Sequence, residues 1–283
     1  MPGLNQSICT HCNIFLMHEI KKNSKNLDKN EELKNIANYY DNRAKKLDEV
    51  RAAGQWGSKE LAPLIVDEIC KKIKIEKQDN VLEIGSGSGV LGNTIKKKCN
   101  LYVGTDISIE MLKKFRDVSE TKLSLFQCNA NILPFPNKLF DVVIMNSVTM
   151  HFNQNNQLEK TLIEIERISK ENSIIFIGDN IVPSESHWEY TWFTKLNSVE
   201  QKLAKPYIRI RKVLAQKNSK LAGKWKKSYA EVSPEYIKKY FGNRAKVIKT
   251  ESSASFIKNK QANNKNSRRV DFVIILEKSS KIS

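Results

Sequence analysis

Apolar residues in the first part of the chain recur every three to four positions, which is typical of amphipathic helices. The clearest series lies between residues 27 and 53 and comprises Leu33, Ile36, Ala37, Tyr40, Ala44, Leu47 and Val50. It predicts one helix or a pair of helices, ended by Gly54 and Gly57. A second series predicts a helix from residue 58 to about residue 73. Both lie before the first clear strand.

From residue 80 onward, short apolar runs alternate with helical patterns. Strands are predicted at 80–85, 101–105, 122–127, 140–146, 173–178, 245–250 and 270–276, and helices at 90–98, 109–117, 154–170 and 234–241. Residues 258–268 are polar and predict a loop. Strands that alternate with helices, and are apolar throughout, indicate βαβ units around a buried sheet. We therefore predict an α/β fold with a doubly wound, seven-stranded, mostly parallel sheet.

The alternation stops at residues 181–232, which show no strand pattern. This segment contains three of the four tryptophans, and Trp188 and Trp192 fall four residues apart on one helical face. We interpret it as a helical insertion after the fifth strand. It is a candidate lid over the sheet, although an aromatic stripe is more often part of a core.

Composition favours a folded protein, because 40% of the 283 residues are apolar. The net charge is +17, and residues 181–283 hold 23 basic against 8 acidic side chains. A polyanionic partner is one explanation; coding bias toward Lys is another. No run of about 18 apolar residues and no signal-peptide pattern is present, so we expect a soluble, cytoplasmic protein.

The five cysteines are few and scattered, and we expect reduced thiols rather than a disulfide framework. Cys9, Cys12 and His18 offer three zinc ligands, but no second cysteine pair completes a tetrahedral site. We favour a frayed segment and predict no metal.

The most informative segment lies at residues 81–92, where a buried strand runs into Gly85, Gly87 and Gly89. Glycines allow a ligand to approach backbone N–H groups closely. The spacing Gly87-x-Gly89-x-x-Gly92 also fits a dinucleotide fingerprint. Glu83 argues against a dinucleotide, because a buried carboxylate would repel a pyrophosphate but can hold an ammonium group.

Further motifs follow the next strands: Asp106 in Gly-Thr-Asp-Ile-Ser, Asn129-Ala130 before Leu-Pro-Phe, and the strand Phe140 to Asn146. With Glu83-x-Gly85-x-Gly87-x-Gly89, they resemble the successive motifs of class I S-adenosylmethionine-dependent methyltransferases. The closest likeness is to the subgroup with ubiquinone/menaquinone-type and small-molecule enzymes. The resemblance covers residues 75–180 well and implies a Rossmann-like methyltransferase fold.

The resemblance also implies a domain organisation. Residues 1–27 would be a flexible segment, residues 28–74 would be helices that cover the cofactor site, and residues 75–283 would be the methyltransferase domain with its lid at 181–232. The cofactor implied is S-adenosyl-L-methionine.

The resemblance assigns roles to individual residues. Gly85, Ser86 and Gly87 would line the methionine part of the cofactor, Glu83 would hold its ammonium group, and Asp106 would accept hydrogen bonds from the ribose hydroxyls. Asn129 would meet the adenine amine, where the family more often has Asp. The adenine ring would lie between three apolar residues, Ile107, Met111 and Ala130. Two polar residues, Asn146 and Tyr40, would approach the methionine end of the cofactor.

The general base is harder to assign, because transfer from a sulfonium depends mainly on alignment. His151 follows the strand end that faces the ligand crevice and is the first candidate; His187, in the insertion, is the second. We predict methyl transfer to an O or N atom of a small-molecule acceptor. A nucleic-acid methyltransferase that uses the basic C-terminal third, and a non-catalytic cofactor-binding scaffold, are the alternatives. The sequence leaves the oligomeric state open.

Overall fold

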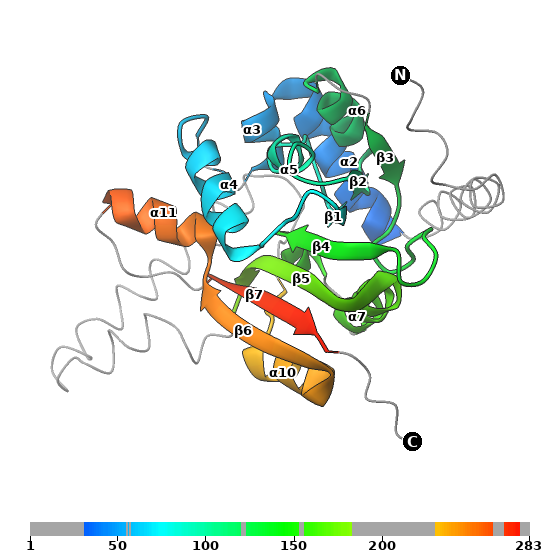
Figure 1. Cartoon of the computed structure of the whole chain (residues 1–283). Coiled ribbons are helices and arrows are strands. Elements are labelled where there is room, and N and C mark those ends of the chain that lie inside the picture. Colours follow the sequence, from blue (N-terminus) through cyan, green and yellow to red (C-terminus); the bar gives the residue numbers. More distant parts are fainter. Residues whose placement is uncertain are drawn as a thin grey trace, which may run out of the picture.

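The computed structural model describes residues 31–54, 56, 58–119, 123–152, 156–182, 230–262 and 269–277. Its centre is a seven-stranded sheet in the order β3-β2-β1-β4-β5-β7-β6 (Figure 1). The strands are β1 (Asn80–Ile84), β2 (Leu101–Asp106), β3 (Ser124–Gln127), β4 (Phe140–Asn146), β5 (Ser169–Ile181), β6 (Ala245–Glu251) and β7 (Arg269–Leu276).

Strand direction agrees with the prediction. The neighbours β3, β2, β1, β4 and β5 are all parallel, whereas β7 is antiparallel to both β5 and β6. The chain leaves β1 toward β2 and β3 and returns on the other side of β1 as β4. Such a reversal of strand order opens a crevice at the carboxyl ends of β1 and β4.

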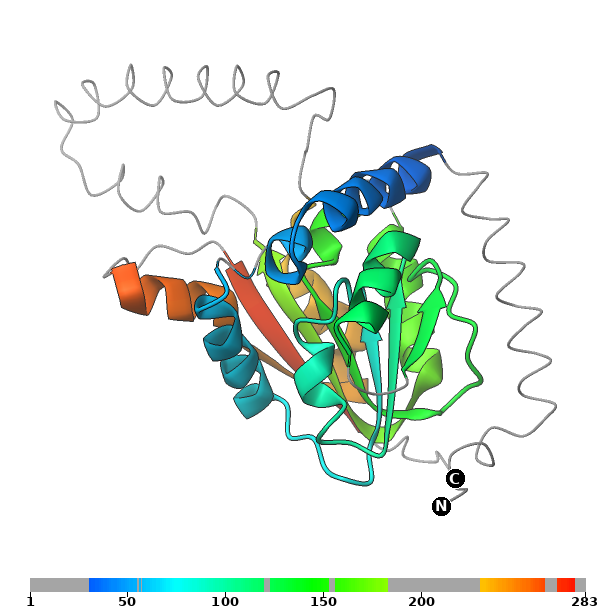
Figure 2. The same cartoon turned by 90° about the horizontal axis from the view of Figure 1, so that it is seen from above.

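The helices cover both faces of the sheet (Figures 1 and 2). They are α2 (Glu31–Lys46), α3 (Glu49–Ala53), α4 (Leu61–Lys72), α5 (Gly92–Ile95), α6 (Ile109–Asp117), α7 (Gln157–Ile168), α10 (Pro234–Phe241) and α11 (Ser253–Ala262), with the 3-10 turns η1 (Thr149–His151) and η3 (Gly242–Arg244).

Alternation along the strands divides the core into two layers. Val81 of β1 and Tyr102 of β2 pack in one cluster with α3, α4, α6 and α11. Leu82 and Ile84 pack in the other with α7 and α10. Because strand side chains alternate in direction, Glu83 lies on the same face as Val81, toward the α4 and α6 side.

Three predicted elements differ from the structure. The helix predicted at 90–98 is a single turn, α5, because Lys97 and Lys98 donate to the carbonyls three residues earlier and tighten the chain. The strand predicted at 173–178 extends to Ser169–Ile181. The loop predicted at 258–268 is wrong for residues 258–262, which belong to α11. The helix forms because Ser252 accepts the amide of Phe256, and Ala254 and Ile257 pack in the α4 core.

Helix α2 is attached to the start of α6. Asp41 Oδ1 accepts hydrogen bonds from the Ser108 hydroxyl at 2.5 Å and from the Glu110 amide at 3.1 Å. Figure 2 shows α2 as a long helix at the rim of the sheet. Among the described helices, none combines the length and apolar character that crossing a membrane requires.

Candidate functional site

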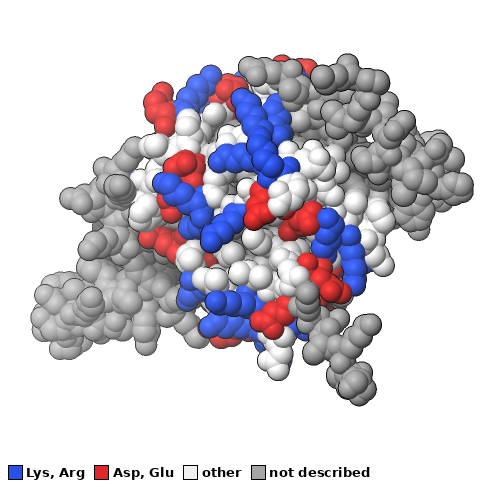
Figure 3. All heavy atoms as spheres, in the orientation of Figure 1, with Lys and Arg blue, Asp and Glu red and all other residues white. Residues whose placement is uncertain are grey.

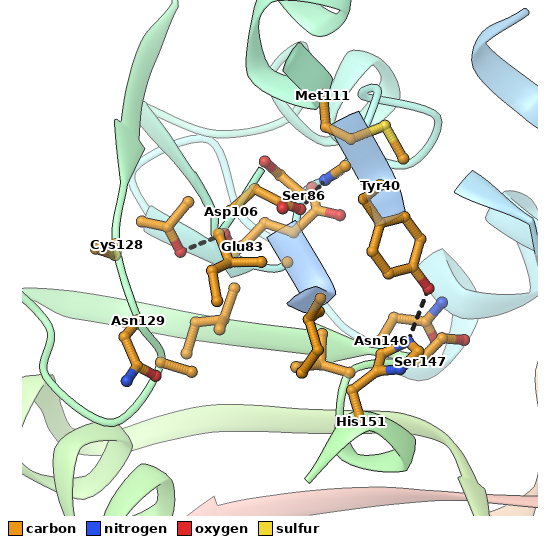
Figure 4. A pocket seen from close by; sticks show the side chains of 18 of the residues that line it. Tyr40, Glu83, Ser86, Asp106, Met111, Cys128, Asn129, Asn146, Ser147 and His151 are labelled. Carbon is orange, nitrogen blue, oxygen red and sulfur yellow. Dashed lines mark hydrogen bonds between the residues drawn. The ribbon is translucent and has the colours of Figure 1, made fainter. Parts of the chain in front are cut away.

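A cavity of about 950 Å³, including its open mouth, lies at the carboxyl ends of β1, β2 and β4. The candidates for cofactor binding and catalysis that line it are Tyr40, Glu83, Gly85, Ser86, Gly87, Asp106, Ile107, Met111, Asn129, Ala130, Asn146 and His151. Figure 4 shows several of their side chains around the cavity, among them Tyr40, Glu83, Asp106 and His151. The other candidate base, His187, lies outside the described residues. So do Cys9, Cys12, His18 and most of the insertion predicted at 181–232.

Other lining residues had no sequence signal of function. They come from α2, from the turns after α3, from the loops after β3 and β4 and from the start of α7, and include Leu33, Ile36, Trp56, Cys128, Ser147, Val148, Phe152 and Gln157. Most are apolar and read as ordinary core residues in the sequence. Within residues 31–74, α2 and the end of α3 face the cavity, whereas α4 packs against α11.

The glycines after β1 serve two different purposes. Gly85 and Gly87 line the cavity with φ of 71° and 54°, and a Cβ on Gly85 would come within 2.3 Å of Val148. Gly89 and Gly92 instead make room for aromatic rings, because a Cβ there would lie 2.1 Å from Phe115 and 2.2 Å from the Tyr102 hydroxyl oxygen, respectively. Only the first pair lines the cavity and forms its glycine cradle.

Asp106 ends β2 and holds the glycine loop. Its Oδ2 accepts the Gly87 amide and its Oδ1 accepts the Ser108 amide, both at 2.8 Å. Burial raises the pKa of Asp106 from 3.8 to about 6, while these amide hydrogen bonds act to lower it. Each carboxylate oxygen has a further lone pair. The side chain can therefore accept hydrogen bonds from two neighbouring hydroxyl groups in the cavity.

Glu83 is 3% exposed and lies in the cavity wall. The Tyr102 hydroxyl donates a hydrogen bond to Glu83 Oε2 at 2.5 Å. Burial raises the pKa of Glu83 from 4.5 to about 8, the tyrosine opposes this shift, and the charge of Asp106 adds to it. Within the described ranges, no Lys or Arg lines the cavity. A ligand cation would therefore meet two carboxyl groups whose ionised forms it stabilises.

Asn129 lies in a short turn after β3. Its Oδ1 accepts the amide of Asn131 at 3.1 Å, which fixes the side chain next to Ala130. Met111, 2% exposed, lines the cavity from α6, together with Ile107 at the end of β2. These residues supply apolar surface and a short polar group, a combination suited to a flat heteroaromatic ring.

The loop after β4 is fixed to β5 at two points. The Ser147 hydroxyl donates to Asp179 Oδ2 at 2.7 Å, and the Thr149 hydroxyl donates to Asn180 Oδ1 at 2.8 Å. Ser147 and Asp179 both have positive φ, 59° and 58°. Backbone strain of this kind persists where the surrounding contacts fix the conformation. These contacts hold the segment that carries His151.

His151 meets α2 across the cavity. Its Nε2 lies 2.7 Å from the Tyr40 hydroxyl oxygen, and the two rings pack edge to face (Figure 4). The pair joins an N-terminal helix to the loop after β4. It places two groups that can exchange a proton at the wall of the cavity.

Two observations test whether this cavity fits a ligand with hydrogen-bonding groups. Ser86 lines the cavity, is 5% exposed, and its buried Oγ has no hydrogen-bond partner within the described part of the protein. Such a group is costly unless a ligand or water satisfies it. Beside it in the cavity wall, a Cβ on Gly85 would strike the Val148 side chain. In the same ranges, no cluster of three or more metal-ligating side chains occurs.

Comparison with known proteins identifies a methyltransferase domain in this part of the chain. Residues 82–177 match the family model described as a methyltransferase domain. These residues run from β1 through β5 and include the glycine cradle, Asp106 and the loop after β4. Residues 82–177 thus form a methyltransferase domain, and the described residues have the fold of class I S-adenosylmethionine-dependent methyltransferases.

Individual relatives agree with this methyltransferase domain. An uncharacterized methyltransferase of Schizosaccharomyces pombe is 31% identical over 94 residues, which is 30% of this chain and 33% of that protein. A phosphoethanolamine N-methyltransferase of Haemonchus contortus, solved with phosphoethanolamine and S-adenosylhomocysteine, has a TM-score of 0.63 at 14% identity, over 89% of this chain and 50% of that one. The chain spans a third or less of the curated relatives that it matches.

A third relative shares the fold over its whole length. The magnesium protoporphyrin IX methyltransferase of Synechocystis PCC 6803, solved with S-adenosylhomocysteine, has a TM-score of 0.52 at 11% identity, over 87% of this chain and all of that one. The methyltransferase fold predicted from the motifs is thereby confirmed. At such low identities the likeness concerns the fold of the domain, and its acceptor has to be argued from the cavity.

Proposed function

We propose that this protein transfers the methyl group of S-adenosyl-L-methionine to an O or N atom of a small-molecule acceptor. The observation that carries the proposal is the meeting of Gly85, Gly87, Glu83 and Asp106 in the wall of one cavity. S-adenosylmethionine, when bound, supplies an electrophilic methyl group on a positively charged sulfur.

Each part of the wall has a role in holding the cofactor. Gly85, Ser86 and Gly87 would line its amino-acid end, and Glu83 would pair with the ammonium group. Asp106 would accept the two ribose hydroxyls. The adenine would lie between Ile107, Met111 and Ala130, with Asn129 at its edge. Burial supports the two carboxylate assignments, because an ionised carboxyl in an apolar wall needs a cation or donor groups opposite it.

The pair His151 and Tyr40 is proposed to orient the acceptor and remove its proton. A neutral imidazole Nε2 accepts the hydrogen of the Tyr40 hydroxyl, while the tyrosine oxygen can accept a hydrogen bond from the acceptor. Proton loss from the acceptor to the tyrosine oxygen, with transfer of the tyrosine proton to His151, leaves His151 charged. His187 remains the second proposed base, on the evidence of the sequence alone.

The acceptor is proposed to be small because the cavity, about 950 Å³ with its open mouth, lies between α2 and the carboxyl ends of the strands and also has to hold the cofactor. The relatives solved with ligands bind phosphoethanolamine in one case, and another is named for a porphyrin substrate. For the N-terminal part, we propose that residues 28–74 complete the cofactor site and that the methyltransferase domain spans residues 75–283 with its insertion at 181–232.

A nucleic-acid acceptor is the second candidate, favoured by the basic excess of the last third of the chain. Much of that excess lies at residues 183–229, which hold 11 Lys and Arg against 3 Asp and Glu. On the face in Figure 3, basic and acidic side chains of the described part are interspersed and form no continuous basic surface. Steep loss of RNA binding with rising salt would favour this candidate.

Calorimetry with S-adenosylmethionine and S-adenosylhomocysteine tests the cofactor assignment first. We expect both to bind in a 1:1 ratio. Acceptors are then screened by formation of S-adenosylhomocysteine, and His151→Ala and Tyr40→Phe are compared with the parent protein on any acceptor found. Binding without turnover on any acceptor would support a scaffold; no binding of either nucleoside would refute the proposal.

A further inference from the structure

The buried pair of Tyr102 and Glu83 is the strongest feature that the proposed function leaves unexplained. Tyr102 is 7% exposed and belongs to the apolar cluster on the α4 and α6 side of the sheet. It does not line the cavity within the described residues. Its hydroxyl nevertheless reaches the carboxylate of Glu83, which does.

The glycine-rich segment is built around this tyrosine. The closest atom to a Cβ on Gly92 would be the Tyr102 hydroxyl oxygen, and Gly89 and Gly92 together leave room for Phe115, which packs edge to face on Tyr102 with ring centroids 6.0 Å apart. Gly89 and Gly92 thus make room for the Tyr102 phenol to lie behind the Glu83 carboxylate. Apolar packing alone would not need the hydroxyl.

The groups around Glu83 leave Tyr102 as its main stabilising partner on the protein side. Asp106 is a like charge that raises the pKa of Glu83 further. The charge of Glu83 adds to the rise in the pKa of the Cys70 thiol of α4, and Cys99 adds to the rise in the pKa of Tyr102. Burial raises the pKa of both thiols, so both are neutral near pH 7. Tyr102 is itself held neutral, because burial and Glu83 raise its pKa.

We propose that Tyr102 is a positioning residue for the amino-acid end of the cofactor: its buried hydroxyl fixes Glu83 against the cavity and favours the ionised form of this carboxyl, which receives an ammonium group. This inference rests on the proposed function, since it assumes that Glu83 meets that ammonium. A hydrogen bond to a charged group is among the stronger ones in proteins. Its loss is expected to affect only ligands that carry the ammonium group.

The test compares two ligands on the parent protein and its variants. The probes are S-adenosylhomocysteine, which has the amino-acid end, and 5′-methylthioadenosine, which keeps adenine, ribose and sulfur but lacks it. For Tyr102→Phe at pH 7 we expect the affinity for S-adenosylhomocysteine to fall about tenfold and that for methylthioadenosine to stay within about twofold. The pH at which S-adenosylhomocysteine binding reaches half of its maximum should move upward, because Glu83 ionises less readily.

Tyr240→Phe is the matched control, because the Tyr240 hydroxyl also donates to a glutamate, Glu166, at 3.2 Å but away from the cavity. Tyr240→Phe should change neither the affinity for S-adenosylhomocysteine nor that for methylthioadenosine. In a Glu83→Gln background, Tyr102→Phe should have no further effect on S-adenosylhomocysteine, since no charge remains to be stabilised.

Two failures can be told apart. If the parent protein binds neither nucleoside, the proposed function is wrong. If it binds both, and Tyr102→Phe weakens methylthioadenosine as much as S-adenosylhomocysteine with no change in the pH profile, Tyr102 is a packing residue only and this inference is overturned. Methylthioadenosine binding also reports whether the variant is folded.

Discussion

Replacing Glu83 by Gln should stabilise the ligand-free protein at alkaline pH. The pKa of Glu83 rises from 4.5 to about 8, chiefly through burial, so the folded state favours the neutral carboxyl. Its contribution to stability is fully present below pH 4.5 and is lost as the pH rises through about 8. A glutamine is neutral throughout and keeps an oxygen that can accept the Tyr102 hydrogen bond.

The interval between the two pKa values sets the magnitude. Each pKa unit corresponds to about 1.4 kcal/mol, so the free energy of unfolding of Glu83→Gln should exceed that of the parent by up to about 4 kcal/mol at pH 8. The difference should shrink to about zero below pH 4.5. This is an upper bound, because water that enters the cavity reduces the cost of the charge.

Urea unfolding of the ligand-free protein at several pH values measures this difference. Glu166→Gln is the control, because Glu166 also accepts a tyrosine hydroxyl but is partly exposed and paired with Arg244. It should change stability by about 1 kcal/mol or less at every pH. If Glu83→Gln is no more stable than the parent at pH 8, the carboxylate is not buried at a cost and the reasoning about this site fails.

Three further substitutions test other parts of the site. Asp106→Ala should weaken S-adenosylmethionine binding at least about tenfold in calorimetry, and unchanged affinity would contradict the ribose assignment. Gly85→Ala should lower the free energy of unfolding by about 2 kcal/mol, because φ is +71° and the new Cβ would strike Val148; a variant as stable as the parent in urea would show that the loop adapts. Asp179→Asn should cost about 3 kcal/mol in urea unfolding, because the buried carboxylate accepts hydrogen bonds from two serine hydroxyls and from Arg269; a loss below about 1 kcal/mol would show that these bonds are not needed.

Much of the fold could be predicted because the buried strands are apolar runs. The strand from Phe140 to Asn146 and the helices at 109–117 and 234–241 have the predicted bounds. Ser108 and Ser233 begin these two helices and accept amide hydrogen bonds from Met111 and Tyr236, as N-cap residues do. Local signals of this kind depend on neighbouring residues alone, and a sequence displays them directly.

The elements that were predicted wrongly depend on distant partners. Asp179 and Asn180 are polar and do not look like strand residues, yet they are fully buried in β5. Asp271 of β7 accepts the amide of Asp179, and Arg269 and Ser252 bind its carboxylate. Similarly, α11 forms in a polar stretch because its first turn is held by Asp271. A single sequence does not show which chain segments meet.

The candidate site likewise contains residues that the sequence identifies and contacts that it does not. Glu83, Gly85 and Asp106 could be named because they occur at strand ends with family spacing. The pairing of Tyr40 with His151 joins residues 111 positions apart, and the support of Glu83 by Tyr102 joins two neighbouring strands. Tyr40 and His151 were each named from the sequence, but not their contact, and Tyr102 has no distinctive sequence signal, since a tyrosine in a strand usually reads as core.

The alternation of β1 explains why stability and binding should oppose each other at Glu83. Val81 and Glu83 share one face of the strand, and that face packs on the apolar cluster that includes Tyr102 and α4. No feature of the sheet requires a carboxyl there, because the position would accept an apolar residue at lower cost. The charge becomes favourable only when a cation lies opposite it. A cofactor with an ammonium group should therefore raise the melting temperature of the parent protein more at pH 8 than at pH 5, when the rise is compared with that of Glu83→Gln at the same pH. An equal rise at both pH values would place the cation elsewhere.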